Sequence, residues 1–385
     1  YFNSKLNKTT GEDILTVTIP LVESLYESIN FSAPSREDKH FRHFYSALTN
    51  RLFVMEQLKD DGIFERIVHI DDDIKQFKKL IIEKFRKTPW LSEKDNLGLA
   101  FLPEFEDKIR DMIVYYDLDE NDRDLELLRA INSKFTQQYY KMKLRSTGVD
   151  IFDIHLSLQI AYHICLWTED AEESMLVLRV EFQLAENAFY YELFNRVAIL
   201  APFLFPELTD KSTLNKHYNL FSTIGHEIFH SVVIEDWANQ SNAFQNGMEC
   251  MNDHFNRTCD AFGKGSCNSG AQTFTEDGPD LEGFRIDYDF LAQNYQEHEL
   301  KEVVFELDFL SVNREQAFFY LHGITFCQTI KEIKNHTDVH SPNQVRVNGV
   351  LTQMPEFSRA FGCTADQQMY SEKGRTCHLF GPDSK

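Results

Sequence analysis

The chain has 385 residues, of which 42% are hydrophobic, and this length predicts a globular protein large enough for two lobes. It carries 61 acidic against 39 basic residues, a formal charge of −22, which repels nucleic-acid phosphates and argues against nucleic-acid binding. No apolar run reaches the roughly 18 residues that a membrane-spanning helix requires, so no membrane-spanning segment is predicted. The chain opens on Tyr1 without a signal pattern, which favours a mature or excised segment.

The first 150 residues predict a helical lobe. One set of apolar residues recurs at helical spacing up to Pro89, namely Ile70, Ile74, Phe77, Ile81 and Phe85. A second set does so further on, namely Leu127, Leu128, Ile131, Phe135 and Tyr139. The acidic segment 117–126 begins like a calcium loop but lacks the required glycine and the final bidentate glutamate, so we interpret it as a solvated charge run. We identify no catalytic residue in this lobe.

A second domain is predicted over residues 151–385. Helical patterns continue there, but residues 187–206 are rich in aromatic and β-branched side chains and close at Pro202 and Pro206. This composition predicts an extended strand, and the edge of a sheet is its natural place. A peptide can be laid along such an edge.

Residues 223–233, TIGHEIFHSVV, contain the pattern HExxH. On a helix His226 and His230 lie on one face, so two imidazoles can reach one ion while Glu227 flanks it. A catalytic zinc ion needs this arrangement, together with a third protein ligand and an open fourth position. The flanking residues are apolar and predict a buried helix, where three polar side chains would be costly without a partner.

The segment TFTEDGPDLEGF supplies a candidate third ligand, Glu276, with Asp280 four residues later. On a helix these two carboxylates share a face. An acidic residue one turn from a metal ligand commonly accepts the free N–H of a coordinating histidine. An acidic pair alone is a weak signal, because most such pairs are solvated.

Four stretches resemble the neprilysin and endothelin-converting-enzyme family of zinc metallopeptidases in identity and in order. They are NAFY at 187–190, GHEIFH at 225–230, ExxxD at 276–280 and DVHSP at 338–342. The closing FSRAFGC and GRTCHLF also resemble the C-terminal end of that family. The resemblance runs from about residue 186 to the end of the chain.

The resemblance implies a thermolysin-like gluzincin catalytic domain, mainly α with a small β-sheet (α+β). It also implies that residues 1–150 are part of the helical lobe that caps the active site. By analogy His226, His230 and Glu276 bind one zinc ion per chain, Glu227 is the general base, and Asp280 orients a ligand histidine.

Four further residues are implied to act on the substrate. Asn187 and Ala188 match the pair that hydrogen-bonds the substrate backbone along the strand edge. His340 resembles the residue that stabilises the oxyanion, and Arg346 the arginine that grips the carbonyl of the residue following the scissile bond.

The function implied is a zinc-dependent endopeptidase that hydrolyses oligopeptides, on the amino side of hydrophobic residues. The alternative is a catalytically impaired pseudo-peptidase that acts as a secreted or cell-surface binding module. One departure from the family favours the alternative: Val233 stands where the family has an acidic residue, unless Glu235 or Asp236 replaces it through a bulge.

A second departure is Pro279, which lies inside the ExxxD spacing. Proline removes a backbone donor and crowds the carbonyl four residues earlier, so we expect it only near a helix start. A helix that began after Glu276 would move this ligand off the expected face and distort the zinc site.

Seven cysteines are present without a CxxC pair, which argues against a structural zinc site. Five N-x-S/T sequons accompany them, at Asn7, Asn30, Asn239, Asn256 and Asn335. Together they favour an oxidising secretory compartment and an extracellular or cell-surface location. Cys259 and Cys267 are close enough to staple a loop, and the resemblance implies a Cys250–Cys377 disulfide. It also implies that Cys327 and Cys363 have partners outside this chain. The sequence does not indicate the oligomeric state.

Overall fold

The computed structural model describes residues 63–93, 100–116, 187–200, 216–263, 267–307, 310–327, 339–371 and 376–384, with the single residues 133, 137, 203 and 214. The chain is divided into two compact units. The unit that contains the HExxH pattern consists of Glu65–Tyr115, Asn187–Ile199 and Phe203–Lys385. The acidic segment 117–126 and the predicted domain boundary at residue 150 lie outside the described ranges, as does the helix predicted over residues 127–139 apart from the single residues 133 and 137. These three remain predictions.

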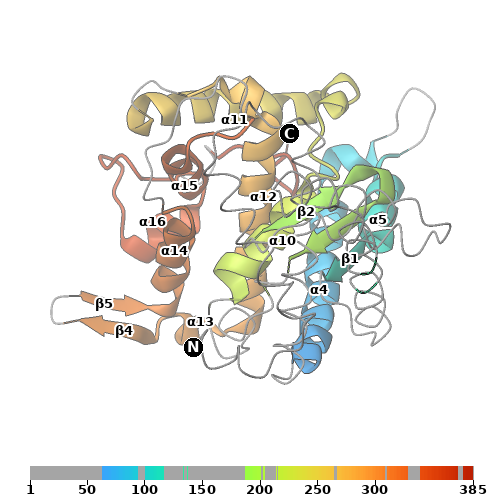
Figure 1. The fold of residues 1–385 in the computed structure, drawn as a ribbon. Coiled ribbons are helices and arrows are strands. Elements are labelled where there is room, and N and C mark those ends of the chain that lie inside the picture. The colour runs from blue at the N-terminus through green and yellow to red at the C-terminus, as the bar shows by residue number, and fades with distance from the viewer. Residues whose placement is uncertain are drawn as a thin grey trace, which may run out of the picture. The chain divides into compact units, whose positions relative to one another are not determined.

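Helices make up most of the described unit, in agreement with the prediction of a mainly α chain with a small β-sheet (Figure 1). They are α4 (Ile63–Arg86), α5 (Leu102–Asp111), α10 (Ser222–Phe229), α11 (Asn242–Phe262), α12 (Gly270–Asn294), α13 (Glu297–Leu300), α14 (Arg314–Thr325), α15 (Asn343–Leu351) and α16 (Pro355–Phe361). Shorter turns are the 3₁₀ helices η2 (Pro89–Ser92), η3 (Glu192–Phe194) and η6 (Glu235–Asn239), and the π-helix η5 (Lys216–Phe221).

The strands form two small sheets. One contains β1 (Ile113–Tyr116), β3 (Arg196–Ile199) and β2 (Ala188–Tyr191), in that spatial order. The other is the hairpin of β4 (Val303–Leu307) and β5 (Leu310–Asn313). Because β2 has a neighbour on one side only in the described sheet, it is an edge strand.

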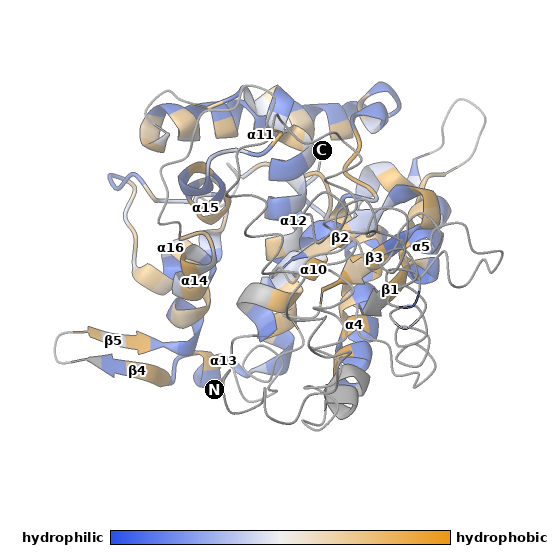
Figure 2. Cartoon of the chain, viewed as in Figure 1, coloured by the Kyte–Doolittle hydropathy of each residue, from blue (hydrophilic) through white to orange (hydrophobic). Residues whose placement is uncertain are grey.

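Helix α4 confirms the first helical pattern, and all five of its predicted core residues are buried. Both hydrophobic and hydrophilic residues recur along α4, as expected for a helix with one buried and one exposed face (Figure 2). The helix ends at Arg86, and Pro89 begins η2. The ring of Phe77 packs against Phe221 and Phe290, with centroids 5.2 and 5.6 Å apart. These contacts join α4 to α12 and to the turn that precedes α10.

The prediction of one extended strand over residues 187–206 is wrong, because the chain reverses within it. β2 and β3 pair antiparallel, with Ala188 opposite Ile199 and Tyr191 opposite Arg196. The reversal depends on Asn195, which adopts a left-handed φ of 46° that asparagine tolerates better than most residues. Its side chain also donates to the carbonyl of Lys108, which fixes the turn.

The expectation that Pro279 marks a helix start is also wrong. Helix α12 begins at Gly270, after the Ser269 hydroxyl has accepted the Gln272 N–H, and it runs through Pro279 to Asn294. Packing sustains the helix there, because α12 crosses α10 with Gly283 against Gly225: a Cβ on Gly283 would lie 2.5 Å from the backbone nitrogen of His226. We infer that burial of α12 against α10 and α11 offsets the lost hydrogen bond.

Both expected disulfides are present, Cys250–Cys377 and Cys259–Cys267, whereas Cys327 and Cys363 are free cysteines. The first disulfide ties the C-terminal segment to α11. Phe380 of that segment is fully buried, and the indole N–H of Trp90 donates to the carbonyl of Leu379. Among the helices in the described ranges, none is long and apolar enough to cross a membrane.

Candidate metal centre

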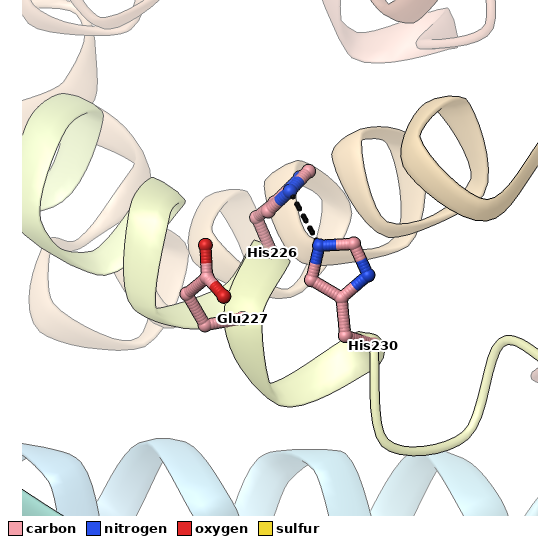
Figure 3. Close-up of side chains that lie close together, drawn as sticks. All are labelled: His226, Glu227 and His230. Atoms are coloured by element: carbon pink, nitrogen blue, oxygen red, sulfur yellow. Dashed lines mark hydrogen bonds between the residues drawn. The ribbon is translucent and has the colours of Figure 1, made fainter. Parts of the chain in front are cut away.

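Helix α10 presents the two histidines of HExxH as the spacing predicts. The Nε2 atoms of His226 and His230 are 2.9 Å apart (Figure 3). Ile224 and Ile228 are fully buried on the core side of the helix. The apolar residues therefore fix the rotation of α10, and the rotation brings the two imidazoles together.

Helix α12 brings Glu276 to the same point. Its Oε2 atom lies 3.2 Å from Nε2 of His226 and 3.5 Å from Nε2 of His230. Ligand atoms about 2.0–2.1 Å from a tetrahedral zinc ion are about 3.4 Å apart, and the three separations here, 2.9, 3.2 and 3.5 Å, are close to that value. This oxygen is buried and accepts no hydrogen bond from the described residues, although imidazole nitrogens surround it. Such a donor set fits zinc.

Glu227 is a second carboxylate near the imidazoles. His226, Glu227 and His230 each offer a ligand atom within 4.8 Å of the others (Figure 3). However, Oε2 of Glu227 accepts the backbone N–H of Tyr190 in β2 at 2.7 Å. Because Glu276 places one oxygen 3.2 and 3.5 Å from the two imidazole nitrogens, while Glu227 is held by β2, we favour Glu276 as the third ligand.

Asp280 connects the histidine pair to α15. Its Oδ1 atom lies 2.7 Å from Nδ1 of His226. Its two oxygens also accept from Nε and Nη2 of Arg346, at 2.6 and 2.7 Å. One buried carboxylate therefore fixes the orientation of both side chains.

The remaining predicted residues lie around this centre. Nε2 of His340 is 3.2 Å from Oε2 of Glu276, and the His340 side chain is 45% exposed. Ala188 is buried in the edge strand β2, and the side-chain oxygen of Asn187 accepts the Ala188 N–H at 3.0 Å. The structure thus brings His340 to the centre and directs the side-chain oxygen of Asn187 to the backbone N–H of Ala188.

Residues 187–377 match the model of peptidase family M13. Over this segment the chain belongs to peptidase family M13, the neprilysin and endothelin-converting-enzyme family of zinc metallopeptidases. Among its relatives, neprilysin of Oryctolagus cuniculus is 29% identical over 208 residues, which cover 49% of this chain and 27% of that protein. Endothelin-converting enzyme-like 1 of Mus musculus is 28% identical over 205 residues, which cover 48% and 26%. The alignment thus spans about a quarter of these relatives.

Solved structures show the same fold. PepO from Lactobacillus rhamnosis HN001 aligns with a TM-score of 0.57 at 16% identity, over 87% of this chain and 49% of that one. The Mycobacterium tuberculosis zinc metalloprotease Zmp1, solved with an inhibitor, aligns with a TM-score of 0.54 at 16% identity, over 81% and 47%. The predicted thermolysin-like gluzincin fold is confirmed, and the chain spans about half of each of these structures.

The side chains of the candidate metal centre have strongly shifted pKa values. Burial lowers the pKa of His226, but Asp280 and Glu276 raise it to about 10. Burial and the neighbouring His226 lower the pKa of His230 to about 4. Burial raises the pKa of Glu276, yet His226 and His340 bring it down to about 2. Zinc would therefore meet an ionised carboxylate, a neutral imidazole, and one imidazole whose proton it must displace.

The departure from the M13 pattern at Val233 has a clear structural setting. Val233 is buried, and a Cβ on Gly278 would lie only 2.7 Å from its Cγ1 atom. Glu235 and Asp236 are exposed at the start of η6. Within the described ranges, apolar packing against α12 therefore takes the place of the acidic residue, and neither later acid replaces it.

Two features of the M13 site do not follow from the sequence interpretation. One is the backbone N–H of Tyr190, which no side-chain pattern could reveal. The other is the hydrogen bond from the hydroxyl of Ser341 to Asp277, 2.9 Å long. Ser341 lies inside the motif DVHSP and Asp277 inside the motif ExxxD, and these positions were the available signal. The motifs, however, assign roles only to His340, Glu276 and Asp280.

Proposed function

We propose that this chain is the catalytic part of a zinc-dependent endopeptidase that hydrolyses peptide bonds in oligopeptides. The observation that carries the proposal is the convergence of His226, His230 and Glu276, with ligand atoms 2.9, 3.2 and 3.5 Å apart. These three residues would hold one zinc ion per chain. When bound, zinc supplies Lewis-acid polarisation of the scissile carbonyl and acidifies water.

Glu227 is the general base in this proposal. Its carboxylate lies beside the two imidazoles and is held at Oε2 by the Tyr190 N–H. From there it takes the proton of the attacking water and then passes it to the nitrogen of the leaving amine. Asp280 keeps His226 oriented through the contact at Nδ1.

The substrate lies along β2 in the proposed mechanism. Because β2 is an edge strand, an extended peptide can pair with it, and Asn187 and Ala188 would bind the peptide backbone. His340 would stabilise the oxyanion, and Arg346 would grip the carbonyl of the residue after the scissile bond.

Cleavage on the amino side of hydrophobic residues is the proposed specificity. The guanidinium carbon of Arg346 lies 4.9 Å from the ring centroid of Phe326. The group that would hold the substrate carbonyl therefore adjoins an apolar surface, which suits a hydrophobic side chain on that same substrate residue. The test is a peptide library with the residue after the scissile bond varied. Preferred cleavage before charged residues would contradict this specificity.

Zinc content and chelator-sensitive cleavage test the function directly. We expect about one zinc ion per purified chain, with cleavage of a fluorogenic hydrophobic peptide that a chelator abolishes and added zinc restores. The reason is that two imidazoles and a buried carboxylate converge at the separations of a zinc site. Absence of zinc from the chain would contradict the proposal.

A second function, that of a pseudo-peptidase binding module, is favoured by one observation. Val233 leaves the centre without an acid that M13 relatives carry, and loss of such a partner typically weakens metal affinity or activity about 10- to 100-fold. The same experiment separates the two functions: bound zinc without cleavage would favour the binding module.

We also propose an extracellular or cell-surface location. Two disulfides are present, and Asn239 and Asn256 are exposed sequon asparagines. Protein made in a secretory host should therefore carry N-glycans at Asn239 or Asn256, measured as a mass loss of the corresponding peptide after glycosidase treatment. Unmodified asparagines at both positions would count against the proposed location.

A further inference from the structure

A buried carboxylate lies directly beside the third candidate ligand and has no part in the proposed mechanism. Asp277 follows Glu276 in α12 and is only 1% exposed. Its Oδ2 atom accepts two hydroxyl donors, Thr273 Oγ1 at 2.6 Å and Ser341 Oγ at 2.9 Å. The first bond stays within the helix. The second joins α12 to the segment that carries His340.

Ser341 is the residue after His340, and the two side chains have different surroundings. Ser341 is 5% exposed, whereas the His340 side chain is 45% exposed and contacts Glu276. The imidazole of His340 is thus half exposed, and its position depends on the backbone of the loop that carries it. A buried hydrogen bond from the adjacent residue to the Asp277 carboxyl group fixes the backbone that carries His340.

The same segment has a second anchor on α12. Arg346 of α15 forms two hydrogen bonds with Asp280, three residues after Asp277. The backbone N–H of Arg346 also donates to the carbonyl of Pro342, which ties the start of α15 to the segment. His340 is therefore the last residue before a stretch that is held on α12 at Ser341 and again at Arg346.

We propose that Asp277 and Ser341 are positioning residues that set the imidazole of His340 at the catalytic centre. The proposal rests on the proposed function and adds two residues that act through His340 without contacting the substrate. An oxyanion stabiliser acts only in the transition state, so a misplaced His340 lowers kcat rather than substrate binding.

Three single variants of the full chain test the proposal. Ser341→Ala should lower kcat about tenfold with KM and zinc content unchanged, because a donor displaced by a fraction of an ångström loses most of its effect. Asp277→Asn keeps an acceptor for both hydroxyls and should retain most of kcat. Thr273→Val is the matched control: it removes the other hydroxyl from the same oxygen, and it should lower thermal stability without lowering kcat.

A double-mutant cycle with His340→Ala separates positioning from a general loss of structure. In the His340→Ala background, Ser341→Ala should cause no further loss of kcat, because the side chain through which it acts is gone. An equal loss in both backgrounds, or a loss from Thr273→Val as large as that from Ser341→Ala, would overturn the proposal.

A readout independent of activity distinguishes failure of this proposal from failure of the proposed function. In protein labelled with ¹⁵N-histidine, Ser341→Ala should shift the His340 imidazole resonances and Thr273→Val should leave them in place. If the parent chain cleaves nothing but this shift is seen, the positioning pair stands and the peptidase function fails. If the parent cleaves peptides but the resonances stay unmoved in Ser341→Ala, the positioning pair fails alone.

Discussion

Replacing Glu227 with glutamine is expected to lower kcat for peptide cleavage by about 10²- to 10⁴-fold while zinc remains bound. Glutamine has nearly the same size, and its oxygen can still accept the Tyr190 N–H that holds Glu227 at 2.7 Å. The amide cannot take a proton from water, however, and the three proposed zinc ligands are untouched. The expected result is therefore loss of turnover without loss of metal or of thermal stability.

Glu235→Gln is the matched control for this prediction. Glu235 is an exposed carboxylate in η6, close to the same helix in sequence, so removing its charge should leave kcat near the parent value. The measurements are kcat, KM and zinc per chain for both variants. Turnover by Glu227→Gln near the parent rate would remove Glu227 from the mechanism and leave the water without a base.

Local sequence patterns were sufficient to predict the elements whose buried residues recur at a regular spacing. The five apolar residues of α4 predict the helix and its buried face, and Pro89 predicts its end, because each signal lies within one short segment of the sequence. HExxH likewise places His226 and His230 together, since helix geometry alone determines their spacing. Glu276 could be paired with them from sequence only through the order of the four motifs.

The two wrong predictions share a physical cause, which is that contacts distant in sequence overrode local preference. Asn195 supports a left-handed turn that a composition of aromatic and β-branched residues conceals, and its bond to Lys108 stabilises that turn. Pro279 is held inside α12 by packing on other helices, which a helix-propensity argument cannot include. Pro279 lies between Glu276 and Asp280 of the candidate site, and such sites are where local rules are most often broken.

Replacing Gly283 with alanine should both destabilise the fold and impair the metal centre. A Cβ there would lie 2.5 Å from the nitrogen of His226 and 2.7 Å from the carbonyl carbon of Gly225, and backbone atoms cannot yield as a flexible side chain can. Helices α10 and α12 must then separate at the point where His226 faces Glu276 across 3.2 Å. We expect the free energy of unfolding to fall by about 3 kcal/mol and zinc per chain to fall well below that of the parent.

Gly323→Ala is the control for the separation of α10 and α12. Gly323 lies inside α14, and its added Cβ would meet only Val347, at an ordinary 3.8 Å, so the variant should gain about 0.5–1 kcal/mol and keep its zinc. Denaturant unfolding in the presence of a chelator measures the free energy of unfolding without the contribution of metal binding. If Gly283→Ala loses stability even there, the helix contact itself keeps His226 and His230 of α10 aligned with Glu276 of α12 at the proposed zinc site. If Gly283→Ala kept the stability and the zinc content of the parent, the crossing of α10 and α12 would tolerate a side chain. Close packing on α10 would then no longer explain why α12 continues through Pro279.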